Sequence, residues 1–175
     1  MRIGFMCRIG ATALVAGVLL GGMRADAATV QVFYHDQSGT QQNGVAADQA
    51  AAMASARLGF AVRAPSLALP GSRLRALWVM DRHAPRFVVL YYGGDDGYIT
   101  CQLHESLNAT AVALNWAPQA PVTIGHVRGV MLQTHIGGAN PVVELIWRAH
   151  GVRYDLLGST ETPLNTLMTM AGTLS

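Results

Sequence analysis

The sequence has no lysine, few charges and almost no cysteine. All twelve basic residues are arginine, and charged residues make up 13% of the 175 positions. Three of these arginines but only one acid, Asp26, lie within residues 1–27, so the remainder carries nine residues of each sign. A neutral chain without clustered cations does not have the charge pattern of a nucleic-acid-binding protein. The 51% hydrophobic content excludes a disordered chain.

Motifs for catalysis and for metal or cofactor binding are also missing. There is no GxSxG elbow, no SxxK pair, no phosphate-binding glycine loop and no dinucleotide fingerprint. The six histidines show no metal-ligand spacing, and Asp95 and Asp96 lack the spaced oxygen ligands of a calcium loop. We therefore predict a protein that is not an enzyme and that holds no metal or cofactor. A hydrolase using His104 or His126 is a weaker alternative.

The first 27 residues resemble a secretory signal peptide. Arg2 and Arg8 precede an apolar stretch, and small residues surround a cleavage site near Ala27/Ala28. The apolar stretch is shorter than a membrane-spanning helix, which favours cleavage over a stable transmembrane anchor. We expect a periplasmic or secreted protein, with an uncleaved anchor as the alternative. Cys101 is then the only cysteine left, and we expect it to be a buried thiol.

Beyond the leader, the sequence predicts residues 28–44 as an N-terminal strand, Thr29–Tyr34, with a polar lead-in, and residues 45–175 as a single α+β domain. Residues 35–44 are expected to form a loop. A helix is expected at 46–58, followed by a brief strand at 60–63. A second helix is expected near the C-terminus, with Thr162 as its cap and Pro163 at its first position.

Further strands are predicted from alternating apolar residues. They cover 73–80, 86–92, 98–105, 126–135, 142–149 and 152–158, whereas 106–121 is expected to be irregular. The predicted fold is a single curved antiparallel sheet of six or seven strands with two helices on one face.

Two hairpins set the expected registers. A His150-Gly151 turn would pair Trp147 with Tyr154. In the other hairpin, pairing Tyr92 with Tyr98 across GGDDG would turn two sets of residues toward the core. These sets are Phe87, Val89 and Tyr91 on one strand and Ile99, Cys101 and Leu103 on the other.

With these registers, the helix-free face of the sheet would be apolar. We predict that eight residues form a surface for a ligand or partner there: Leu77, Val79, Val88, Leu90, Tyr92, Tyr98, Ile146 and Leu157. Coverage of this face by the N-terminal strand and the 106–121 loop is the alternative interpretation.

Several segments resemble an extracytoplasmic domain family of unknown function. They are ARLGFAVRAPSLALPGSRL (56–74), FVVLYY (87–92), HVRGV (126–130), ELIWRAHGVRYDLLG (144–158) and the closing PLNTLMTMAGTL. The family occurs in bacterial anti-sigma factors and in secreted or lipid-anchored envelope proteins, and is distantly similar to periplasmic lipoprotein carriers. Its pattern supplies no catalytic residues.

Together these features predict an exported, non-enzymatic binding or sensory module. Its expected partner is an envelope protein or a hydrophobic, acyl-bearing ligand, and not a nucleic acid. The alternative is an accessory structural subunit of an envelope complex, or a homodimer, with the apolar sheet face buried.

Overall fold

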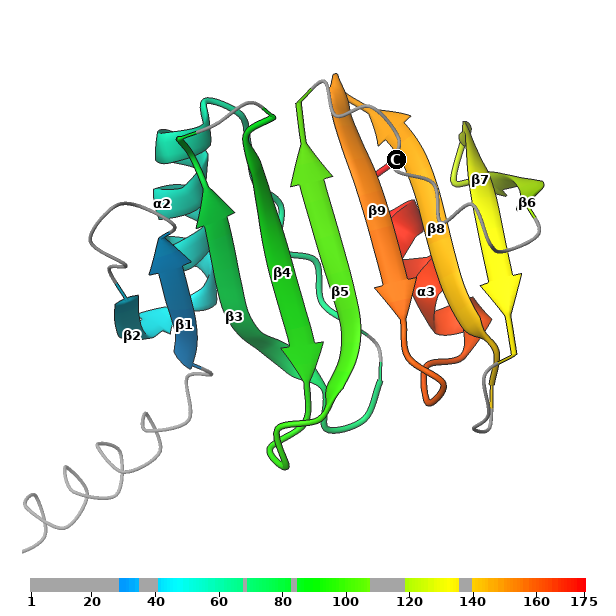
Figure 1. The fold of residues 1–175 in the computed structure, drawn as a ribbon, viewed down its shortest axis with the longest axis horizontal. Helices are drawn as coiled ribbons and strands as arrows, with labels where there is room; N and C mark the ends of the chain where they lie inside the picture. The colour runs from blue at the N-terminus through cyan, green and yellow to red at the C-terminus, as the bar shows by residue number, and fades with distance from the viewer. Residues whose placement is uncertain (1–28, 35–40, 68, 83–84, 108–118, 136–139) are drawn as a thin grey trace, which may run out of the picture.

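The computed structural model describes residues 29–34, 41–67, 69–82, 85–107, 119–135 and 140–175. These residues form one open, mixed sheet of nine strands and two helices, an α+β fold (Figure 1). The strand order is β2-β1-β3-β4-β5-β9-β8-β7-β6. The predicted signal peptide lies outside the described residues, and so do parts of the predicted 35–44 and 106–121 loops.

The strands follow the chain in two groups. The first five strands are β1 (Thr29–Tyr34), β2 (Gln41–Ala46), β3 (Arg73–Met80), β4 (Phe87–Gly93) and β5 (Ile99–Ser106), with the helix α2 (Ala47–Leu58) between β2 and β3. The second group is β6 (Gln119–Ile124), β7 (Val127–Thr134), β8 (Val142–Ala149) and β9 (Val152–Gly158), followed by the helix α3 (Leu164–Gly172).

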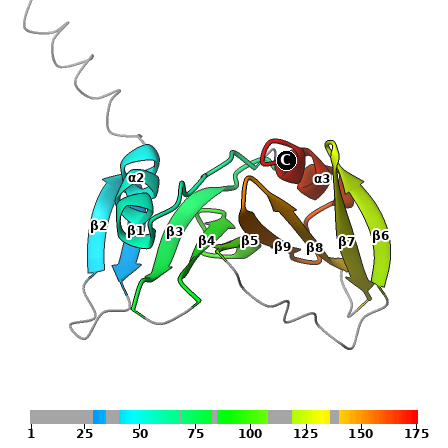
Figure 2. The same cartoon turned by 90° about the horizontal axis from the view of Figure 1, so that it is seen from above.

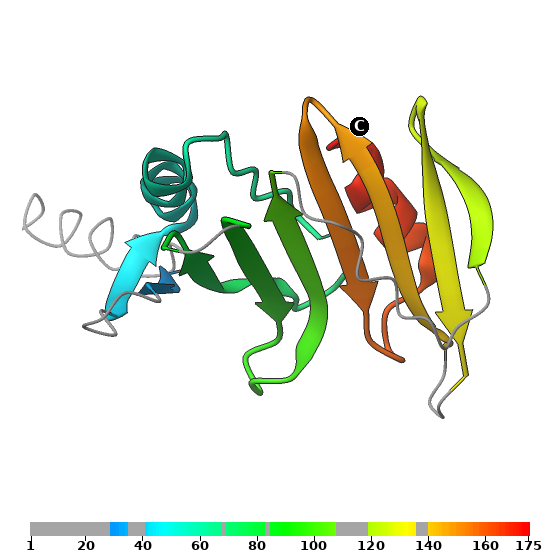
Figure 3. The same ribbon diagram turned by 45° about the horizontal axis from the view of Figure 1, so that its top comes forward.

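Both helices lie on the same face of a curved sheet, at opposite ends of it. Figure 2 shows α2 beside β1 and β3 and α3 beside β8 and β9, and Figure 3 shows the same arrangement from another side. The core lies between the helices and this face, where Leu77, Leu90, Leu103, Leu156 and Leu167 are fully buried. Neither helix of the described part of the chain has the length and apolarity needed to cross a membrane.

The strand count and the pairing differ from the prediction. Seven predicted strands are present, but β2 and β6 were missed, and β1 pairs with β3 in parallel. Both missed strands are sheet edges. β2 is largely exposed and lacks apolar alternation. β6 alternates at Ala120, Val122 and Ile124, but it contains Pro121, and its first three residues fall in the segment that was expected to be irregular. The parallel pair arises because α2 carries the chain from β2 back to the other side of β1.

Two local predictions around the helices were wrong. Residues 60–63 form no strand; they belong to the segment that joins α2 to β3 across the helix side of the sheet (Figure 2). Thr162 does not cap α3, because the cap residue is Pro163 and the Thr162 hydroxyl donates instead to the carbonyl oxygen of Thr100.

The β8–β9 hairpin is confirmed as predicted. Trp147 lies opposite Tyr154, and their rings stack with centroids 5.1 Å apart. His150 and Gly151 have φ values of 52° and 77°, the left-handed pair that a two-residue turn requires. A two-residue turn allows only one register between its strands, so the local sequence was sufficient to predict the pairing.

The β4–β5 register differs from the prediction. Tyr92 lies opposite Cys101, not Tyr98, and Leu90 lies opposite Leu103. This is a shift of three positions, and because side chains alternate between faces, an odd shift exchanges the two faces of β4. Val88, Leu90 and Tyr92 are therefore buried, whereas Phe87, Val89 and Tyr91 are half-buried on the helix-free face.

A β-bulge at Thr100 accounts for one of these three positions and makes the shift odd. Tyr92 pairs with Cys101 and Gly93 with Ile99, which leaves Thr100 as an extra residue in β5. Its hydroxyl donates to the Tyr92 carbonyl (3.2 Å) and lies 2.7 Å from the Ser72 hydroxyl. Its carbonyl accepts the N–H of Ser159 (2.9 Å). The bulge thus connects β4, the segment before β3 and the segment after β9.

We expect Thr100→Val to lower the free energy of unfolding by about 1–2 kcal/mol, because it leaves the size of the side chain nearly unchanged and removes its buried hydrogen bonds. Urea denaturation of the purified protein measures the change. Thr123→Val, at an exposed position of β6, is the matched control and is expected to change stability much less. Equal losses in the two variants would contradict the role assigned to Thr100.

Candidate functional site

The structure separates the eight residues predicted to form an apolar surface. Leu77, Val79, Val88, Leu90 and Tyr92 lie in the core beneath the helices. Ile146 and Leu157 lie half-buried on the helix-free face, and Tyr98 is 47% exposed beside the β4–β5 turn. The placement of the first five on the helix-free face was wrong because the assumed β4–β5 register was wrong.

A different set of side chains occupies the helix-free face. Across β1, β3 and β4, Phe33 pairs with Trp78 and Trp78 pairs with Val89. Trp78 is 43% exposed, a large fraction for an aromatic side chain in the middle of a sheet. The neighbouring row contains Gln31, Ala76 and Tyr91. This end of the face is therefore apolar and aromatic, bordered by polar groups.

Three β-bulges surround one end of that row. In β2, Asn43 and Gly44 together oppose Gln31, and Gly44 has φ 73°, as a glycine bulge requires. In β3, Arg75 is the extra residue between Leu74 and Ala76. The third bulge is the one at Thr100, next to Ile99. These are the register shifts found in the described ladders of the sheet.

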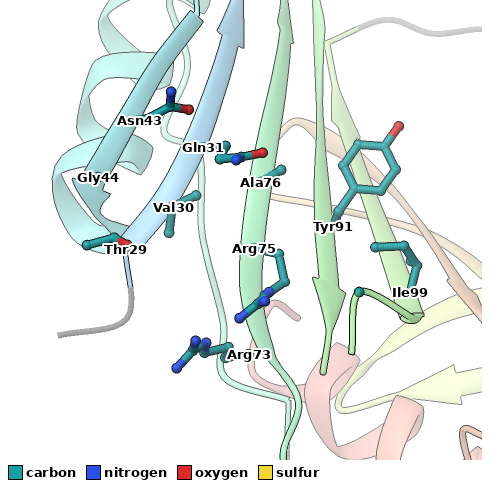
Figure 4. Close-up of a pocket in the computed structure, with 11 residues that line it drawn as sticks. Thr29, Val30, Gln31, Asn43, Gly44, Arg73, Arg75, Ala76, Tyr91 and Ile99 are labelled. Carbon is teal, nitrogen blue, oxygen red and sulfur yellow. The ribbon is translucent and has the colours of Figure 1, made fainter. Parts of the chain in front are cut away.

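The bulges frame a pocket of about 520 Å³. The parallel ladder of β1 and β3 begins at Gln31 and Ala76, so Thr29 and Val30 line one side while Arg73 and Arg75 line the other (Figure 4). The rest of the lining is contributed by Gln31, Asn43, Gly44, Ala76, Tyr91, Gly97 and Ile99. The pocket combines two guanidinium groups and two side-chain amides with a phenol and an apolar wall.

Both arginines bind the same carboxylate oxygen. Arg73 Nη2 donates to Asp95 Oδ1 at 2.7 Å, and Arg75 Nη1 donates to the same oxygen at 2.9 Å. The Asp95 side chain is 78% exposed, so solvent screens these ion pairs. The residues that line the pocket include these two arginines and no acid, whereas Asp95 and Asp96 line an adjoining pocket of about 300 Å³. The arrangement is suited to bind an anionic group.

Sequence reasoning missed this site, although one signal for it was present. In an antiparallel meander the turn after β4 lies beside the start of β3, which places GGDDG next to Arg73 and Arg75. What could not be seen is the bulge at Arg75. In a regular strand, Arg73 and Arg75 would face the same side as the buried Leu77.

A second polar cluster lies nearer the centre of the helix-free face. His104 pairs with Asp155, and Arg153 Nη2 lies 3.8 Å from Asp155 Oδ2. Burial raises the pKa of Glu144, helped by its hydrogen bond with Asp155. Burial lowers the pKa of His104, whose ring packs on Phe87 at 4.6 Å. No group of three possible ligands for a metal ion occurs among the residues that the structure describes.

The prediction that Cys101 is a buried thiol is confirmed. Cys101 is 1% exposed, and burial raises its pKa to about 12, which makes it a poor nucleophile. Glu105, on the same strand, is fully buried on the helix side, where both carboxyl oxygens lie 3.2 Å from the backbone nitrogen of Arg63. Burial raises the pKa of Glu105 to about 8, against the smaller opposing effect of Arg63.

Comparison of the chain with protein-family models, with curated protein sequences and with solved structures found no match. The resemblance to an extracytoplasmic domain family therefore remains a prediction.

The pKa of Glu105 predicts how stability changes with pH. Because this pKa is raised in the folded state, the folded protein binds more protons than the unfolded chain between about pH 4.5 and pH 8. The free energy of unfolding should therefore fall as the pH rises through this range. Glu105→Gln should remove this contribution. Relative to the wild type, the free energy of unfolding of the variant should therefore be higher at pH 8.5 than at pH 4.5, by up to a few kcal/mol.

Urea denaturation at a series of pH values measures both curves. Glu161→Gln, which also removes one carboxylate but at an exposed position, should follow the wild type. A constant difference between Glu105→Gln and the wild type from pH 4.5 to pH 8.5 would contradict the prediction.

Proposed function

We propose that the chain is an exported, non-enzymatic binding module that holds the anionic group of a ligand in the bulge-framed pocket. The observation that carries this proposal is the convergence of Arg73 and Arg75 on a single oxygen atom at 2.7 and 2.9 Å. Guanidinium groups bind carboxylates and phosphates through charge-assisted hydrogen bonds, the strong class of hydrogen bond in proteins. The pattern of residues 1–27 supports export.

The surroundings of the pocket indicate the rest of the ligand. Tyr91 and Ile99 border the arginines, and Val89 and Trp78 continue the apolar surface along the same face. With a volume of about 520 Å³, the pocket is in the range of small-molecule sites. A ligand with an anionic group and an apolar or aromatic body matches these features, which retains part of the hydrophobic ligand expected from the sequence.

The alternatives have less support. An accessory subunit or homodimer was inferred from eight apolar residues, five of which are buried within the chain itself. A histidine-dependent hydrolase has less support because the structure does not bring its two candidate histidines together. His104 lies in β5 and His126 in the turn between β6 and β7, and β9 and β8 separate β5 from β7 in the sheet.

Binding of phenyl phosphate tests the proposal, because this probe combines an anion with an aromatic ring. We expect saturable binding by isothermal calorimetry, with a Kd of about 1 mM for so small a molecule. Arg75→Gln should weaken binding about 10-fold or more, because one of the two charge-assisted contacts is lost. Arg128→Gln, at an exposed position of β7, is the matched control and should bind as the wild type does.

Two results would contradict the proposal. One is the absence of saturable binding in low salt, where surface electrostatic attraction is strongest. The other is an equal loss of binding in Arg75→Gln and Arg128→Gln, which would indicate a general effect of net charge and no specific pocket.

A further inference from the structure

We propose that Asp95 competes with the ligand for Arg73 and Arg75. The ligand must then carry an anionic group that binds these arginines more strongly than a carboxylate does, namely a phosphate monoester. This inference rests on the proposed function. Asp95 already occupies the position where Arg73 and Arg75 converge, and its carboxylate has the chemistry of the commonest organic anion. In the free protein the two guanidinium groups are therefore already paired with the chain's own side chain, which lines the adjoining pocket of about 300 Å³.

The turn that carries Asp95 does not depend on the contacts of its carboxylate. Within residues 93–98, Gly94 N–H donates to the Tyr98 carbonyl at 3.2 Å, and Gly97 N–H donates to the Gly94 carbonyl at 3.3 Å. The Asp96 carboxylate accepts the Tyr98 N–H at 3.0 Å. Asp96 thus closes the turn, while Asp95 points to the arginines with a side chain that is 78% exposed. Asp95 can leave the arginines without unfolding the turn.

A free monocarboxylate gains little by replacing Asp95. The exchange substitutes one carboxylate for another at the same two guanidinium groups, and the free ligand loses translational and rotational freedom that the tethered side chain does not lose. Asp95 therefore lowers the apparent affinity for every anion. Anions that bind the two arginines only weakly are then no longer bound at ordinary concentrations.

A phosphate monoester has the properties needed to displace Asp95. It carries a charge of about −1.5 to −2 at neutral pH and three strong acceptor oxygens. Two of these oxygens can accept hydrogen bonds from the guanidinium groups of Arg73 and Arg75, the groups that now bind Asp95. The screened pairs of Asp95 are weak enough for such a group to replace.

The test compares phenyl phosphate with benzoate, its carboxylate analogue, in the wild type, Asp95→Asn and Asp96→Asn. In the wild type, phenyl phosphate should bind clearly more tightly than benzoate. Asp95→Asn should raise both affinities by the same factor, about 5- to 10-fold, because removal of a competitor acts equally on all ligands of one site. Asp96→Asn removes a charge from the same turn but no arginine contact, and should change both affinities much less.

Through-space repulsion by Asp95 gives a different result. Asp95→Asn would then raise the affinity for the doubly charged phosphate far more than that for benzoate, and Asp96→Asn would behave in the same way. That pattern, or no change in either affinity, would overturn the competitor role. Equal binding of the two probes by the wild type would overturn the preference for phosphate. Absence of binding of both probes in every variant would instead overturn the proposed function.

A further experiment shows whether the phosphate belongs to a lipid headgroup or to a soluble ester. Sedimentation of the wild type with phosphatidic acid vesicles, lost in Arg75→Gln and absent with phosphatidylcholine, would place the phosphate on a lipid headgroup. Binding of phenyl phosphate without sedimentation would place it on a soluble ester. Each result supports a phosphate monoester as the ligand group and assigns its source.

Discussion

The register between β4 and β5 decides which side chains form the core of this fold. The extra residue at Thr100 sets Leu90 opposite Leu103 and turns both into the core. The same bulge carries the hydrogen bonds that connect β5 to Ser72 and Ser159, which lie before β3 and after β9 in the sequence. Because side chains alternate along a strand, this single insertion decides which side of β4, and through it of β3, faces the helices.

The bulge in β3 explains how a strand in the middle of the sheet supplies charged residues to a pocket without losing core contacts. Leu74 and Leu77 are both buried although they are three positions apart, a spacing that regular alternation would place on opposite faces. The extra residue at Arg75 restores the alternation between them. Arg73 and Arg75 can then share a carboxylate on the helix-free face while both leucines stay in the core.

The features that could be predicted from the sequence are those that neighbouring residues determine. Strands β3, β8 and β9 were predicted with correct bounds, and the β8–β9 register followed from a two-residue turn. The GGDDG turn is longer and adjoins a bulge, so it admits several registers, and hydrophobicity could not choose between Phe87, Val89, Tyr91 and their equally apolar neighbours. The edge strand β2 lacks apolar alternation, and the edge strand β6 contains a proline. A parallel β1–β3 pair requires knowledge of where α2 crosses. The pocket depends on all three features, so it was not predictable.

The charged groups of the fold divide into those that are fixed and those that can exchange partners. Glu105 is sealed in the core and bound to the Arg63 backbone, and its ionisation costs folding free energy, so no ligand can reach it without opening the structure. Asp95 differs in each respect, since it is exposed, screened and carried by a turn that closes without it. Exchange of one anion for another requires such weak and accessible contacts. The bulge at Arg75 places these contacts on the helix-free face, so the proposed exchange of anions would leave the core unchanged.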